Sequence, residues 1–157
     1  RSWRDMRPCI EDAAAAVEAV ASAGASAITL MGFSMGGAVA VSVAGHPLVD
    51  QVIGLAPWLS DRLDLSPLRG RRLDVLHGSL DRWLPAIPGV PASVSRRGAE
   101  RAEALGVPTS YRLIRGGVHG IAARSRIGMV RFPRAAEWLD GVDGLLSAIR
   151  DPARTRT

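Results

Sequence analysis

Apolar residues gather in four short runs along the chain, and the segments between these runs are longer and mix apolar with polar positions. The runs lie at about 27–33, 51–56, 73–77 and 109–114, and runs of this length predict strands. The mixed segments predict helices at about 5–23, 35–44, 94–105 and 133–149. Strands that alternate with helices predict an α/β fold, with a mostly parallel sheet of about four strands and helices on both faces.

The pattern also predicts where the strands lie. The first runs are continuously apolar, which is typical of buried central strands. The fourth run alternates, with Arg112 between two apolar residues, which suits an edge strand. The last helix is predicted to open with Pro133 at its first position and to be interrupted at Gly141 and Gly144.

The rest of the chain is predicted to be organised around one domain. The segment from Leu84 to Ser93 carries three prolines and is predicted to be irregular. Residues 1–150 form one predicted domain, and the arginine-rich residues 151–157 are expected to be a disordered tail.

A serine follows the first predicted strand directly, within residues 32–37, which read Gly-Phe-Ser-Met-Gly-Gly. A strand, a sharp turn and a helix in succession would present Ser34 at the carboxyl end of the strand. Such a turn needs small neighbours, which Gly32 and Gly36 provide. The helix that begins near Met35 would direct free N–H groups at the same point. The Gly-x-Ser-x-Gly pattern resembles the nucleophile elbow of the α/β-hydrolase family. The alternative interpretation is that Ser34 is a plain helix N-cap.

Two later loops carry the other residues that this resemblance implies. Asp81 stands in His77-Gly78-x-x-Asp81 after the third predicted strand, and His119 stands in Gly117-Val118-His119-Gly120 after the fourth. Both stretches look like the acid and histidine loops of α/β-hydrolases, in the family's chain order of Ser, Asp and His. The resemblance therefore implies a serine hydrolase of the esterase kind, which acts on a small-molecule ester through an acyl-serine and needs no cofactor.

Residue chemistry suggests a role for each group. His119 would take the hydroxyl proton of Ser34, since the ordinary pKa of histidine lies near neutral pH. Asp81 would hold the imidazole in the useful tautomer. The Met35 amide would donate a hydrogen bond to the oxyanion. Phe33 and Trp58 are candidates for lining the substrate pocket.

Some of these residues have other interpretations. Asp81 could cap a turn before Pro85, and Asp61, after the second predicted strand, is a rival for the acid. Trp58 could instead pack under a loop. We expect His46 and His77 to be structural.

Composition excludes several classes of function. The net charge is +5, but all 20 basic residues are arginines scattered along the chain, so no basic face for nucleic acid is predicted. No apolar run is long enough to span a membrane. The single Cys9 and the three scattered histidines do not have the spacing that predicts a metal site.

The chain departs from the family in length. Nothing before residue 27 resembles the strands that normally precede the nucleophile strand, so we expect a fragment equivalent to the later part of the fold. Four consequences are expected: a missing second oxyanion donor, one thinly covered sheet face, an open sheet edge and self-association through that edge. The short segment between the second and third predicted strands resembles small, lidless, dienelactone-hydrolase-like members. An acyltransferase and a non-catalytic binding module stay open as alternatives. Any signal peptide would lie upstream of Arg1, and the cytoplasm is the default expectation.

Overall fold

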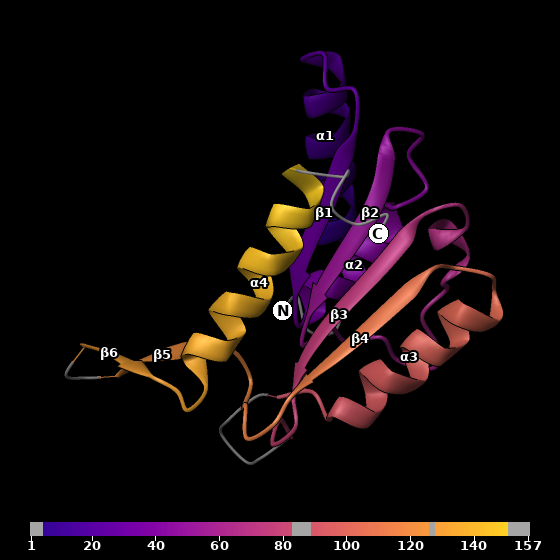
Figure 1. The fold of residues 1–157 in the computed structure, drawn as a ribbon. Coiled ribbons are helices and arrows are strands. Elements are labelled where there is room, and N and C mark those ends of the chain that lie inside the picture. The colour runs from indigo at the N-terminus through magenta and orange to yellow at the C-terminus, as the bar shows by residue number, and fades with distance from the viewer. Residues whose placement is uncertain (1–4, 83–88, 126–127, 151–157) are drawn as a thin grey trace.

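The fold is known from a computed structural model, which describes residues 5–82, 89–125 and 128–150. Four parallel strands form one sheet in the order β1-β2-β3-β4 (Figure 1). They are β1 (Ile28–Phe33), β2 (Val49–Leu55), β3 (Arg72–Gly78) and β4 (Thr109–Ile114). The predicted strands are confirmed to within two residues at each end.

Helices cover both faces of the sheet, as predicted. They are α1 (Arg7–Ser22), α2 (Met35–Val43), α3 (Ala92–Ala104) and α4 (Ala135–Arg150), with one short 3-10 turn, η1 (Ser66–Leu68). The larger core joins α1, α2 and α3 to one sheet face through side chains such as Val17, Val41 and Ala102. The smaller core joins Trp138 of α4 to Leu76 and Ile114 on the other face. Figure 1 shows α4, in yellow, on the opposite side of the sheet from α2.

The last helix differs from the prediction. It begins at Ala135, so Pro133 lies two residues before it, in a turn. It also runs without interruption through Gly141 and Gly144. A Cβ at Gly141 would lie 2.4 Å from Leu76 Cδ2, so this glycine allows the helix to approach the sheet closely. Packing against β3 thus outweighs the low helix propensity of glycine.

A hairpin between the fourth strand and the last helix was not predicted. The strands β5 (Ala122–Ser125) and β6 (Gly128–Arg131) pair antiparallel and extend away from the main sheet (Figure 1). Each strand has only four residues, which is too short for a clear alternation of apolar and polar positions. The prolines at 85 and 88 and the predicted tail at 151–157 lie outside the described residues.

Both edges of the sheet bear on the predictions. β4 lies at one edge, as the alternation around Arg112 predicts. β1 lies at the other edge, so its continuous apolar run does not mark a central strand in this chain.

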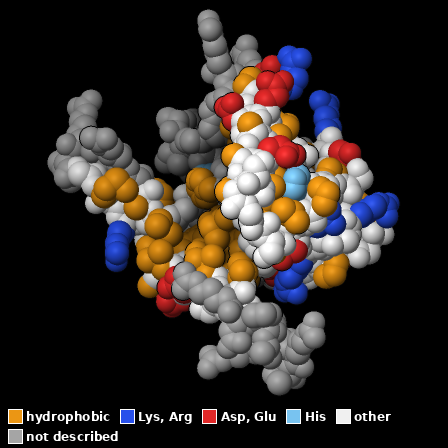
Figure 2. Space-filling view, turned by 90° about the horizontal axis from the view of Figure 1, so that it is seen from above, with side chains coloured by type: hydrophobic (Ala, Val, Ile, Leu, Met, Phe, Trp, Pro, Cys, Tyr) orange, Lys and Arg blue, Asp and Glu red, His pale blue; other side chains and the backbone are white. Residues whose placement is uncertain are grey.

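On the face shared with α4, the side chains of Met31 and Phe33 are 43% and 46% exposed. Hydrophobic side chains gather in one region of the surface in Figure 2, with most charged side chains around its periphery. One face of the sheet is therefore thinly covered. Within the described ranges, no helix is both long and apolar enough to cross a bilayer.

Candidate active site

The turn between β1 and α2 holds Ser34 in an unusual backbone conformation. Its φ is 55° and its ψ is −120°, a region that residues other than glycine rarely occupy. Three backbone hydrogen bonds fix this turn: Ser34 N–H donates to Leu55 O at 2.9 Å, and Ser34 O accepts from Trp58 N–H at 2.9 Å and from Gly37 N–H at 3.1 Å. The side chain occupies the N-cap position of α2 but makes no capping hydrogen bond. The structure therefore does not support the plain N-cap interpretation.

The glycines around this turn differ in whether a side chain would fit at their positions. A Cβ at Gly32 would lie 2.2 Å from Gly36 O, so only glycine fits at position 32. A Cβ at Gly36 would meet nothing within 4 Å outside its own helix, so the expected need for a small residue there is not found. The second close contact is at Gly37, where a Cβ would lie 2.5 Å from Pro57 Cβ.

We expect Gly32→Ala to lower the free energy of unfolding by about 3 kcal/mol or more, because the backbone of Gly36 cannot move away without unwinding the first turn of α2. Gly36→Ala is the matched control and should be neutral or stabilising by up to about 1 kcal/mol, since alanine favours a helix. Urea unfolding followed by circular dichroism measures both. Equal effects at the two positions would contradict this description of the turn.

The first turn of α2 supplies a backbone donor beside Ser34. No backbone acceptor for the Met35 amide occurs in the part of the chain that the structure describes. The positive end of the helix dipole lies at the same point. This amide is thus available to an anionic oxygen near the Ser34 side chain.

The loops after β3 and β4 are bonded to each other. Ser79 N–H donates to Ile114 O at 2.9 Å, and Leu80 N–H donates to Gly117 O at 2.8 Å. A Cβ at Gly78 would lie 2.4 Å from Gly117 O, so glycine is needed where the loops touch. These contacts bring Asp81 and His119 together although 38 residues separate them in the sequence.

Asp81 and His119 form a close, partly buried pair. His119 Nδ1 lies 2.6 Å from Asp81 Oδ2, and Asp81 Oδ1 accepts a hydrogen bond from Val90 N–H at 3.0 Å. Asp81 is 5% exposed. Burial raises the pKa of Asp81, but the hydrogen bonds from His119 and His77 outweigh it, so the pKa lies below its ordinary value. Asp81 is therefore a carboxylate at neutral pH. Because Asp81 bonds Nδ1 of His119, the other ring nitrogen, Nε2, can face another group.

Phe33 connects this pair to the Ser34 turn. The rings of Phe33 and His119 lie with centroids 4.7 Å apart and are tilted by 43°. Phe33 directly precedes Ser34, so the histidine loop reaches the end of β1 through this contact. Among the described residues, no hydrogen bond joins the Ser34 hydroxyl to His119. In the structure, Asp81 therefore contacts His119, and the His119 ring contacts Phe33, the residue before Ser34.

The rival acid Asp61 and the histidine His46 make other contacts. Asp61 is exposed and pairs with Arg97 on α3 at 3.4 Å. His46 Nδ1 accepts a hydrogen bond from Leu48 N–H at 3.2 Å, which is consistent with a structural role.

His77 is fully buried and contacts Asp81 as well. Its Nε2 lies 3.1 Å from Asp81 Oδ2, and its Nδ1 lies 2.6 Å from Ser95 Oγ. Ser95 Oγ in turn lies 2.9 Å from Tyr111 Oη. The sequence offered no signal for Ser95 or Tyr111, because they lie on α3 and β4 rather than in a loop after a strand.

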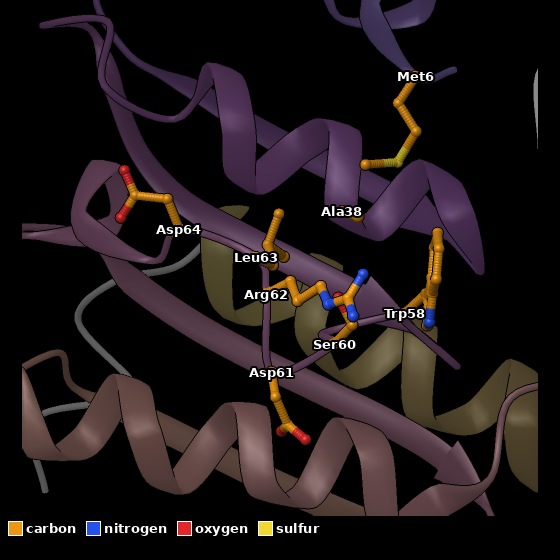
Figure 3. A pocket seen from close by; sticks show the side chains of 8 residues that line it. All are labelled: Met6, Ala38, Trp58, Ser60, Asp61, Arg62, Leu63 and Asp64. Atoms are coloured by element: carbon orange, nitrogen blue, oxygen red, sulfur yellow. The ribbon is translucent and has the colours of Figure 1, made fainter. Parts of the chain in front are cut away.

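A cavity of about 540 Å³ lies beside α2 and not at the Asp81–His119 pair. Its lining, drawn in Figure 3, consists of Met6, Ala38, Trp58, Ser60, Asp61, Arg62, Leu63 and Asp64. Figure 3 shows Trp58 at one end, near Ala38, and Asp64 towards the other end. Trp58 is the link to the candidate site, because its amide bonds Ser34 O while its side chain lines this cavity.

Comparison with known proteins supports the fold. No family model matches the sequence, and no curated protein resembles it significantly. A serine hydrolase homologue from Coxiella burnetii aligns with a TM-score of 0.57 and 22% identity over 70% of this chain and 50% of its own. Esterase PE8 aligns with a TM-score of 0.58 and 18% identity over 92% of this chain and 59% of its own. SOBER1 from Arabidopsis thaliana aligns with a TM-score of 0.56 and 17% identity over 71% of this chain and 55% of its own.

These solved structures are all larger than this chain, which spans about half of their length. The chain has an α/β-hydrolase-like fold.

Proposed function

We propose that this chain carries the catalytic residues of a serine hydrolase that cleaves carboxylic esters. The observation that carries the proposal is the 2.6 Å contact between Asp81 and His119 at the same end of the sheet as the strained turn at Ser34. A serine, an imidazole and a carboxylate recur together on unrelated folds as an acyl-transfer site, and the Asp81–His119 contact would supply two of these groups. The solved structures of similar fold include a serine hydrolase homologue and an esterase, which agrees with this chemistry.

The proposed reaction has two halves. His119 Nε2 takes the proton of Ser34 as Oγ attacks the ester carbonyl, and Asp81 stabilises the resulting imidazolium through Nδ1–H. The Met35 amide donates to the oxyanion of the tetrahedral intermediate. The alcohol leaves with the proton from His119, and an acyl-serine remains. Water, deprotonated by His119, then attacks the acyl carbon, the bond to Ser34 Oγ breaks, and His119 returns the proton to Oγ as the acid is released.

The side chains around the site favour an apolar substrate group. Phe33 is 46% exposed beside His119, and Leu80 is 57% exposed beside Asp81. We assign Phe33 and Trp58 to substrate contact, with Trp58 on the side of the cavity at α2. Because only 16 residues separate β2 from β3, we place the chain nearest to small, lidless, dienelactone-hydrolase-like esterases.

Release of p-nitrophenol from p-nitrophenyl acetate and butyrate tests the proposal. Hydrolysis above the buffer rate supports it. Addition of an alcohol acceptor then separates hydrolysis from acyl transfer, because a transferase yields the new ester at the expense of the free acid. A folded chain that neither hydrolyses these esters nor transfers their acyl groups would favour the non-catalytic binding module.

We also propose that two copies associate through the free edge of β1. Among the strands that the structure describes, β1 pairs only with β2, its six residues include no charge and no proline, and Met31 is 43% exposed. Such an edge is open to pairing with another strand. Met31→Lys should therefore shift the chain towards monomer in light scattering after gel filtration. Met129→Lys, at a 70% exposed methionine on β6, is the control and should leave the mass unchanged. A wild-type chain that is monomeric at all concentrations would contradict this proposal.

A further inference from the structure

His77 is a buried titratable side chain that the proposed reaction does not use. It lies on β3 with its ring fully buried. Its Nε2 lies 3.1 Å from Asp81 Oδ2 and 2.8 Å from Val90 O. Both of these oxygens are acceptors, so Nε2 carries a proton and donates it to them.

Further hydrogen bonds hold the His77 ring at Nδ1, the nitrogen that does not face Asp81. With its proton on Nε2, His77 accepts at Nδ1 from the hydroxyl of Ser95, which lies 2.6 Å away. Tyr111 Oη lies 2.9 Å from Ser95 Oγ and 3.0 Å from Ala92 O. These contacts fix the ring between β3, α3 and β4, so it cannot turn away from Asp81.

We propose that His77, supported by Ser95 and Tyr111, is a positioning residue that fixes the Asp81 carboxylate so that Oδ2 meets His119 Nδ1. The inference rests on the proposed function, since the carboxylate that it positions is the acid of that site. Asp81 follows β3 in a loop, and a loop carboxylate free to rotate would offer His119 a variable partner. Here Val90 N–H holds Oδ1 while His77 Nε2–H holds Oδ2.

Ser95, His77 and Asp81 are the same three residue types as the candidate triad, but they are not a second catalytic site. Ser95 and His77 are both fully buried, so no substrate reaches the hydroxyl. The arrangement meets the proposed base His119 through Asp81, whose Oδ2 lies within hydrogen-bond distance of both imidazoles. Its effect on catalysis therefore has to pass through the shared carboxylate.

The charges around Asp81 set the expected dependence on pH. Asp81 faces His77 on β3 and His119 after β4, and Arg96 on α3 lies 4.6 Å from the centre of the Tyr111 ring. Burial raises the pKa of Asp81, and the hydrogen bonds from both imidazoles lower it. Removing the His77 donor removes one of the contributions that favour the carboxylate. The pKa of Asp81 then rises, and the acidic limb of the pH profile moves towards neutral pH.

The variants His77→Phe and His77→Gln test the inference by ester hydrolysis. Phenylalanine fills the space but cannot donate, so kcat should fall about 10- to 100-fold with KM nearly unchanged, and the acidic limb should move to higher pH. The amide of glutamine can donate from the position of Nε2 and should restore most of kcat. His46→Gln, at the other structural histidine, is the control and should behave as wild type. A folded His77→Phe variant with wild-type kcat and an unchanged pH profile would overturn the inference.

Nuclear magnetic resonance on the wild-type chain tests the same contact without any activity. The ¹⁵N signals of His77 should show a proton on Nε2, and a bare Nε2 would overturn the inference even if the variants do not fold. Ser95→Ala keeps the His77 ring but removes the hydroxyl that supports it. The low-field proton between His119 Nδ1 and Asp81 should therefore shift in this variant. An unchanged signal would count against the inference. If the chain hydrolyses no ester but both signals behave as expected, the proposed function fails and the positioning contact stands.

Discussion

Ser34→Ala is expected to reduce ester hydrolysis by at least about 10³-fold, to a rate close to that in buffer, because it removes the hydroxyl that we propose forms the acyl-enzyme. The fold should survive, since the Ser34 side chain makes no capping hydrogen bond to α2. Rates of p-nitrophenyl ester hydrolysis, measured at equal concentrations of folded protein, give the ratio.

Ser42→Ala is the matched control for this substitution. Ser42 also lies on α2, where its hydroxyl donates to Ala38 O at 2.9 Å, and it should keep the wild-type rate. Comparable hydrolysis by wild type and Ser34→Ala would show that the activity resides elsewhere.

Asp81→Asn is expected to lower kcat by about 10⁴-fold while leaving the geometry largely intact, because an amide can trap His119 in the wrong tautomer. The 2.6 Å contact to His119 Nδ1 is the physical basis for this expectation. Stopped ester assays at high enzyme concentration, with circular dichroism to verify folding, measure the loss.

Asp61→Asn separates the two candidate acids. Asp61 is exposed and paired with Arg97, so this variant should stay within about twofold of the wild-type rate. If Asp61→Asn lost activity and Asp81→Asn did not, the acid would be misassigned.

The fold was predictable because its signals are local. The strands of the main sheet carry short apolar or alternating runs, α3 carries an amphipathic pattern, and α2 is bounded by Ser34 and Gly45. The predictions failed where contacts between residues far apart in the sequence determine the structure. Gly141 lies inside α4 because Leu76 on β3 packs against it, and the local pattern does not contain that contact. The β5–β6 hairpin pairs residues too few to show any period.

The candidate residues could be proposed from the sequence, but their surroundings could not. Ser34, Asp81 and His119 each follow a strand in a loop with glycine, so their positions could be read from the sequence. The close approach at Gly37, the ring contact between Phe33 and His119 and the network behind His77 join residues from different elements. No pattern along the chain encodes these contacts, because they depend on how α3 and the loops pack onto the sheet.

The central claim is that Ser34 is an activated nucleophile, and covalent labelling tests it most directly. A fluorophosphonate probe reacts with a serine whose proton a neighbouring base removes. We predict that intact-mass analysis of the folded chain shows one adduct, that peptide mapping places it on Ser34, and that it disappears in Ser34→Ala. A folded chain that acquires no adduct, or that carries it on another serine, would contradict the account.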